Sequence, residues 1–142
     1  MNLPLNVDFS GKVVVITGAG GVLCGEMARA YAQAGAKVAA LDLNEEAVQK
    51  LADELTAEGY ICKGYKANVL DPEALEAVHQ QVLADLGPCD ILVNGKHRSG
   101  DSRYCVCDNT GVFRAEPRCS SYRSYSDSLR RRLDNVTYCK IL

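Results

Sequence analysis

Residues 13–25 read Val-Val-Val-Ile-Thr-Gly-Ala-Gly-Gly-Val-Leu-Cys-Gly, and an acidic residue, Asp42, lies further along the chain. An apolar, β-branched run leads into a glycine-rich turn, and the turn opens into an alanine-rich segment with a helical pattern. This order predicts a strand, a tight turn and a helix whose N-terminal N–H groups face a phosphate. An acidic residue at the end of the next strand can accept hydrogen bonds from a ribose diol. The stretch therefore predicts a dinucleotide site.

The alternation of strand and helix patterns continues to residue 95. We expect helices that begin at the caps Asn44 and Asp71-Pro72 and that end near Gly35, Gly59 and Gly87. The expected strands are 12–17, 37–42, 60–67 and 90–94, and Gly64 is expected to weaken the third of them. The expected helices are 23–34, 45–58 and 72–86. This order predicts an α/β fold, a Rossmann-like doubly wound parallel sheet that is incomplete, with about four strands and three helices. Right-handed crossovers place the fourth strand beside the first, on the side away from the second.

The chain changes character near residue 95. Residues 1–95 carry six basic and thirteen acidic side chains, a net charge of −7, whereas residues 96–142 carry ten basic and five acidic ones, a net charge of +5. Alanine occurs once after residue 95, while seven of the eight serines and four of the seven cysteines lie there. The apolar residues of this part follow neither a strand nor a helix period. We therefore expect a domain over 1–95 and a separate, irregular, disordered tail over 96–142.

Composition bounds the environment of the protein. The net charge of −2 gives the chain no general attraction to nucleic acid. The sequence contains no run of 18 apolar residues, so no membrane span is predicted. Residues 1–10 lack the basic and apolar regions of a signal peptide, so we interpret the seven cysteines as thiols. The expected location is the cytoplasm.

Residues 7–95 resemble the short-chain dehydrogenase/reductase family, which binds NAD or NADP at a Thr-Gly-x-x-x-Gly-x-Gly turn. Three segments are similar in sequence to the D-mannonate oxidoreductase (fructuronate reductase) branch of this family: residues 17–24, Leu41-Asp42-Leu43-Asn44 and residues 87–95. The resemblance implies hydride transfer between nicotinamide and an alcohol or ketone, here a sugar acid. The predicted cofactor-binding residues are Thr17, Gly18, Ala19, Gly20, Gly21, Val22, Leu23, Asp42, Asn68, Val69, Asn94 and Gly95.

The chain departs from the family pattern at several of these positions. Val22 and Cys24 stand where the family has its later two glycines, so we expect Gly20-Gly21 to provide the close approach to the phosphate. Asn68 replaces a family aspartate, and its carboxamide oxygen can still accept a hydrogen bond from the adenine amino group. No Lys or Arg lies in the turn or just after Asp42 to hold a 2′-phosphate, so NAD is expected in preference to NADP.

The catalytic residues of the family are absent from this sequence. The family uses a Tyr-x-x-x-Lys pair, and none of the seven tyrosines has a lysine four residues later. We therefore assign no catalytic residue and expect a truncated, inactive, aggregation-prone chain that lacks most of the family's homo-oligomer interface and substrate pocket. The coincidence of this loss with the change in composition suggests a shift of reading frame near codon 96. Translating the DNA in the other two frames tests this hypothesis.

Other interpretations stay open. A methyltransferase that binds S-adenosylmethionine also has a glycine turn and a strand-end acid, although Thr17-Gly18 and Asn94-Gly95 favour the dehydrogenase. A nucleotide-binding module without chemistry is a second alternative. Cys24 is interpreted as a small packing residue. His79 is interpreted as a packing or boundary residue beside the apolar stripe of its helix, which is expected to consist of Leu75, Val78, Val82, Leu83 and Leu86. Zinc binding by the tail is disfavoured, because His97, Cys105, Cys107, Cys119 and Cys139 lack paired spacing, and Arg130-Arg131-Arg132 is interpreted as a solvated run.

Overall fold

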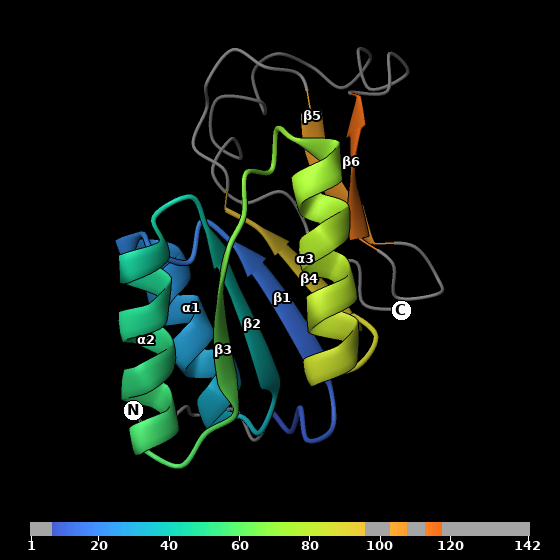
Figure 1. Ribbon diagram of the computed structural model, residues 1–142. Coiled ribbons are helices and arrows are strands. Elements are labelled where there is room, and N and C mark those ends of the chain that lie inside the picture. The colour runs from blue at the N-terminus through green and yellow to red at the C-terminus, as the bar shows by residue number, and fades with distance from the viewer. Residues whose placement is uncertain (1–6, 96–102, 108–112, 118–142) are drawn as a thin grey trace, which may run out of the picture.

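The computed structural model describes residues 7–95, 103–107 and 113–117. Its main element is a four-stranded parallel sheet in the order β3-β2-β1-β4 (Figure 1). The strands are β1 (Val13–Thr17), β2 (Lys37–Asp42), β3 (Cys62–Lys66) and β4 (Ile91–Asn94). Thr17 at the end of β1 pairs with Leu41 of β2 and with Asn94 of β4, so the carboxyl ends of these strands meet at one edge. The predicted fold class and strand order are confirmed.

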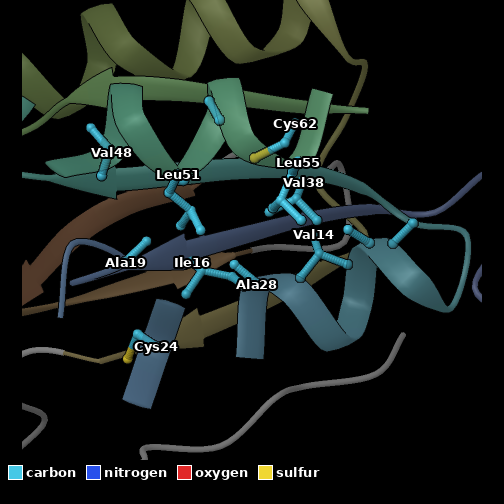
Figure 2. Packing of buried hydrophobic residues seen from close by; sticks show 14 of the residues in the cluster. Val14, Ile16, Ala19, Cys24, Ala28, Val38, Val48, Leu51, Leu55 and Cys62 are labelled. Carbon is cyan, nitrogen blue, oxygen red and sulfur yellow. The ribbon is translucent and has the colours of Figure 1, made fainter. Parts of the chain in front are cut away.

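Three helices cover the two faces of this sheet. Helices α1 (Val22–Gln33) and α2 (Glu45–Ala57) lie on one face, and α3 (Pro72–Asp85) lies on the other (Figure 1). Alternate residues of β1 therefore enter different cores, with Val14 and Ile16 packing towards α1 and α2 and Val13 and Val15 towards α3. Figure 2 shows the first of these cores. Burial on both faces explains why β1 is apolar throughout instead of alternating with polar residues.

The expected caps fix where the helices begin. The Asn44 side-chain oxygen accepts a hydrogen bond from the Ala47 amide at 3.2 Å. Asp71 accepts from the amides of Glu73 and Ala74 at 3.1 and 3.2 Å, and Pro72 follows it at the first helical position. These contacts satisfy amides that have no partner within their own helix.

The buried stripe of α3 differs from the prediction at one position. Leu83 was expected on the apolar face, but it is 42% exposed. His79 is instead 3% exposed and lies on the buried face with Leu75, Val78 and Val82. The reason is helical spacing, because residues 75, 79 and 82 share one side of a helix whereas residue 83 lies about 100° further round than residue 82.

Part of the tail forms a second, antiparallel sheet. Strands β5 (Arg103–Cys107) and β6 (Phe113–Pro117) pair so that Cys107 is opposite Phe113 and Arg103 is opposite Pro117. In Figure 1 this pair lies beyond β4, and β6 runs beside α3. The sequence pattern did not predict the pair, because only the five residues of β6 alternate between apolar and polar and those of β5 do not. The other tail residues considered above, including His97, Cys119, Cys139 and the run 130–132, lie outside the described residues.

Among the residues that the structure describes, no helix combines the length and the apolar character needed to cross a membrane.

A polar cluster fastens the edge strand β3 to the end of α3. The Tyr65 hydroxyl donates to Asp85 Oδ2 at 2.8 Å, and Lys63 Nζ lies 3.0 Å from Asp85 Oδ1. The hydrogen bonds from Lys63 and Tyr65 lower the pKa of Asp85. Burial and the bond to Asp85 raise the pKa of Tyr65. The carboxylate is therefore stabilised in its charged form by contacts that exist only in the folded chain.

Because of this cluster, the free energy of unfolding should decrease as the pH falls through the native pKa of Asp85. The native pKa of Asp85 is lowered, so its contribution is present above the ordinary carboxyl pKa of 3.8 and disappears as the pH falls through the native value. We expect Asp85→Asn to lower the urea midpoint at pH 7. The difference between the midpoints of the variant and the wild type should shrink progressively below about pH 4. Glu76→Gln, at an exposed position on the same helix, is the control. A difference that stays constant from neutral pH to about pH 2 would contradict the assignment.

Candidate functional site

A cleft of about 560 Å³ opens at the carboxyl ends of the four parallel strands. Each strand contributes the loop that follows it, as expected for ligand sites in open α/β sheets. The lining residues are Thr17, Gly18, Gly21, Val22, Leu23, Cys24, Leu41, Asp42, Leu43, Ala67, Asn68, Val69, Leu70 and Gly95. None of these described residues is Lys or Arg.

The glycine-rich turn forms one wall of the cleft. Gly18 has a φ of +72°, and a Cβ at this position would lie 2.6 Å from the Gly95 carbonyl oxygen. Gly21 caps α1 with its backbone in an extended conformation, without a side-chain hydrogen bond, and the first turn of α1 contains no acidic residue. The first amides of α1 therefore remain available to an anion, whose charge the helix dipole favours.

Asp42 connects the turn to the loop after β2. Its Oδ2 accepts a hydrogen bond from the Gly20 amide at 3.0 Å, and its Oδ1 accepts one from the Asn44 amide at 2.9 Å. The Ala19 amide donates to the Leu41 carbonyl at 3.1 Å in the same region. Ala19 and Gly20 therefore lie against the end of β2, where Ala19 is buried and Gly20 is exposed.

The far end of the cleft is formed where β1 meets β4. Thr17 is 1% exposed, and the Gly95 amide donates to both its carbonyl oxygen and its hydroxyl, each at 3.1 Å. The Thr17 hydroxyl also lies 3.5 Å from Asn94 Oδ1. Thr17 thus holds the backbone after β4, and Asn94 stands behind the lining.

Asn68 and Val69 follow β3 and line the cleft opposite α1. The Asn68 side-chain oxygen accepts from the Leu70 amide at 3.1 Å, and its carbonyl accepts from the Asp71 amide at 3.0 Å. The carboxamide oxygen has a second lone pair, so a bond to a ligand amino group remains compatible with this turn.

Cys24 occupies the place of a family glycine without becoming a reactive group. It is 6% exposed, and its sulfur fills the space that a Cβ on Gly95 would need. Burial, and to a lesser extent the charge of Asp42, raises the pKa of the thiol. A thiol that stays protonated is a poor nucleophile, so Cys24 serves as a packing residue.

The structure brings nine of the twelve predicted site residues into one lining, which does not include Ala19, Gly20 and Asn94. Five further residues line the cleft and were not predicted as cofactor-binding: Cys24, Leu41, Leu43, Ala67 and Leu70. Their sequence signal is position alone, because Cys24 follows the glycine turn and the other four lie within two residues of Asp42 or Asn68. A shallower depression of about 680 Å³ runs along the outer face of α2, but its walls come from that single helix, between Glu45 and Glu54.

Residues 12–102 match the family profile of the short chain dehydrogenases. The chain belongs to this family. The match reaches seven residues beyond the boundary that the sequence resemblance indicated at residue 95. It also favours a dehydrogenase over the methyltransferase alternative.

Relatives of this short-chain dehydrogenase family are considerably longer than the chain. An uncharacterized oxidoreductase from Haemophilus influenzae is 43% identical over 109 residues, which cover 77% of this chain and 38% of the relative. A solved structure assigned as a D-mannonate oxidoreductase from Haemophilus influenza, with bound NAD, is 46% identical over 61% of this chain and 31% of that protein, with a TM-score of 0.60. A family member from Burkholderia phymatum, solved in complex with NAD, is 32% identical over 60% of this chain and 30% of its own, with a TM-score of 0.57. The chain therefore spans about a third of the length of these proteins.

Proposed function

We propose that the cleft binds NAD and that the chain represents part of a cytoplasmic oxidoreductase, which in its full-length form transfers hydride between the nicotinamide and a sugar acid, D-mannonate or D-fructuronate. The observation that carries the cofactor assignment is the placement of Asp42 beside a glycine turn, in a cleft whose lining contains no cation. The sugar-acid assignment rests on the likeness to the D-mannonate oxidoreductase structure.

The residues of the cleft fit the chemistry of NAD. The uncapped amides at the start of α1 would hold the pyrophosphate, and glycines at residues 18 and 21 leave the backbone open to it. Asp42 would accept hydrogen bonds from the adenosine ribose, while Asn68 and Val69 would contact the adenine. When bound, NAD supplies the hydride acceptor of the reaction.

We further propose that residues 1–95 form the cofactor-binding unit and that residues 96–142 are a separate segment. The sequence contains no Tyr-x-x-x-Lys pair to exchange the substrate proton. The 142-residue chain should therefore bind the cofactor without turnover. This is the behaviour of a non-catalytic nucleotide-binding module, and it is the second candidate function.

Calorimetric titration of the full chain with NADH and NADPH tests the cofactor assignment. We expect NADH to bind more tightly than NADPH, because the Asp42 carboxylate repels a 2′-phosphate. Asp42→Ala should weaken NADH binding by about tenfold to a hundredfold, since hydrogen bonds to a charged group contribute about 1.5–3 kcal/mol. Asp53→Ala, at an exposed position of α2, is the control.

The outcomes separate the two candidates. Binding of NADH without loss of its absorbance when D-fructuronate is added supports the non-catalytic module. Measurable turnover would establish an active oxidoreductase and contradict the expectation of inactivity. Binding of neither cofactor, or tighter binding of S-adenosylmethionine, would overturn the cofactor assignment.

A further inference from the structure

We infer that Gly20 supports the preference for NAD over NADP, because its amide holds the Asp42 carboxylate in place and the Ala47 side chain leaves little space for a side chain at position 20. The inference rests on the proposed function and adds one specificity-determining position, Gly20, to it. Gly20 is not among the residues that line the cleft, and it acts through its hydrogen bond to Asp42.

The carboxylate of Asp42 is fixed on both sides by backbone donors. The Gly20 amide reaches Oδ2 at 3.0 Å, and the Asn44 amide reaches Oδ1 at 2.9 Å. A carboxylate has about four lone-pair sites, so each oxygen keeps one for a ribose hydroxyl. The two bonds therefore orient the side chain before any ligand arrives and leave it able to bind a diol.

Gly20 has little room for a side chain. A Cβ at residue 20 would lie 3.0 Å from the Ala47 Cβ and 3.1 Å from both Cγ and Oδ2 of Asp42. The φ angle of Gly20 is not positive, so the backbone conformation does not require glycine here and the crowding around position 20 favours it instead. Gly20 was expected to permit the approach of a phosphate, and its contact with Asp42 adds a second role, which is to leave space for that carboxylate.

Ala47 is the rigid side of this contact. It lies in the first turn of α2, where its amide donates to the cap Asn44 at 3.2 Å. The carboxylate is the end of a side chain with rotatable bonds, whereas the Ala47 Cβ is attached directly to the helix backbone. A larger residue at position 20 therefore displaces the carboxylate more readily than it displaces the helix.

A displaced carboxylate would lose its selectivity. Its hydrogen bonds to the ribose would weaken, and its repulsion of a 2′-phosphate would fall with distance. We expect Gly20→Ala to lower the affinity for NADH about tenfold and to change the affinity for NADPH little, so that the ratio of the two falls about tenfold.

A double variant shows that the effect comes from this contact. Ala47→Gly removes the methyl group that a side chain at position 20 would strike, so Gly20→Ala/Ala47→Gly should regain most of the NADH affinity even though glycine weakens the helix. Asp53→Ala, at an exposed position of α2, is again the control and should leave the NADH affinity within about twofold. Circular dichroism confirms that each variant is folded.

A readout without cofactor distinguishes this inference from the proposed function. In the cofactor-free chain, Gly20→Ala should change the amide proton shift of Asn44 and accelerate its exchange, and the double variant should restore both. Wild-type NADH affinity and an unchanged NADH to NADPH ratio in Gly20→Ala would overturn the inference. Failure of the wild-type chain to bind either cofactor would overturn the proposed function and the selectivity role. Unchanged Asn44 signals in Gly20→Ala would show in addition that residue 20 does not hold Asp42.

Discussion

Replacing Gly18 with alanine is expected to lower the free energy of unfolding by roughly 2–4 kcal/mol. Gly18 has a φ of +72°, a left-handed conformation that costs about 1–2 kcal/mol for a residue with a Cβ. The new methyl group would also lie 2.6 Å from the Gly95 carbonyl oxygen, which is backbone and is held by the bonds from the Gly95 amide to Thr17. The junction of β1 and β4 must therefore open.

Urea unfolding followed by circular dichroism measures this effect, and Gly11→Ala is a matched control. Gly11 has a similar φ of +78°, but a Cβ there would meet nothing within 4 Å. The control therefore contains the backbone strain without the collision. Equal losses of stability in the two variants would show that the contact with Gly95 is unimportant. Gly18→Ala should also abolish NADH binding, because the same junction shapes the cleft.

Replacing Gly64 with alanine is expected to lower the free energy of unfolding by roughly 2–3 kcal/mol. A Cβ at residue 64 would lie 2.7 Å from the Val48 carbonyl oxygen and 2.8 Å from its carbonyl carbon, both in the backbone of α2. The helix must move away from β3, which loosens Val48, Leu51 and Leu55 in the core between them. β-Propensity alone predicts the opposite sign, because alanine in a strand is normally more stable than glycine.

The sign of the effect decides this prediction. Lys66→Ala, two residues further along β3, removes only a surface ion pair with Glu45 at 3.5 Å and should change the stability by less than about 1 kcal/mol. Thermal unfolding of both variants provides the measurement. An increase in the midpoint for Gly64→Ala would mean that the contact between α2 and β3 is not tight.

Local sequence rules were sufficient for the arrangement of the elements. β2 begins and ends where it was predicted, and Asn44 and Asp71 cap their helices as expected. These features depend on residues close together in the chain. A cap accepts hydrogen bonds from amides two or three residues away, and an uninterrupted apolar run indicates a strand that is buried on both faces. The strand order followed because parallel connections have one preferred hand.

Contacts between distant residues were not predicted. The sequence predicted that Gly64 would weaken β3, and only the position of α2 shows why glycine is required there. The burial of His79 in place of Leu83 depends on how α3 is rotated against the sheet. The β5 and β6 pair likewise was not predicted, since the alternation in β6 covers only five residues and β5 does not alternate.

The sequence by itself determined the family, the parallel sheet and the residues that lie at its carboxyl edge, because glycine turns, caps and apolar runs act within a few residues. The tertiary structure alone decided what each of these residues does there. Thr17 holds the backbone of Gly95, Cys24 fills the space beside it, and Gly20 leaves room for Asp42. These roles depend on distances between elements about 20 to 80 residues apart, and such distances exist only after α1, α2 and β4 have packed together.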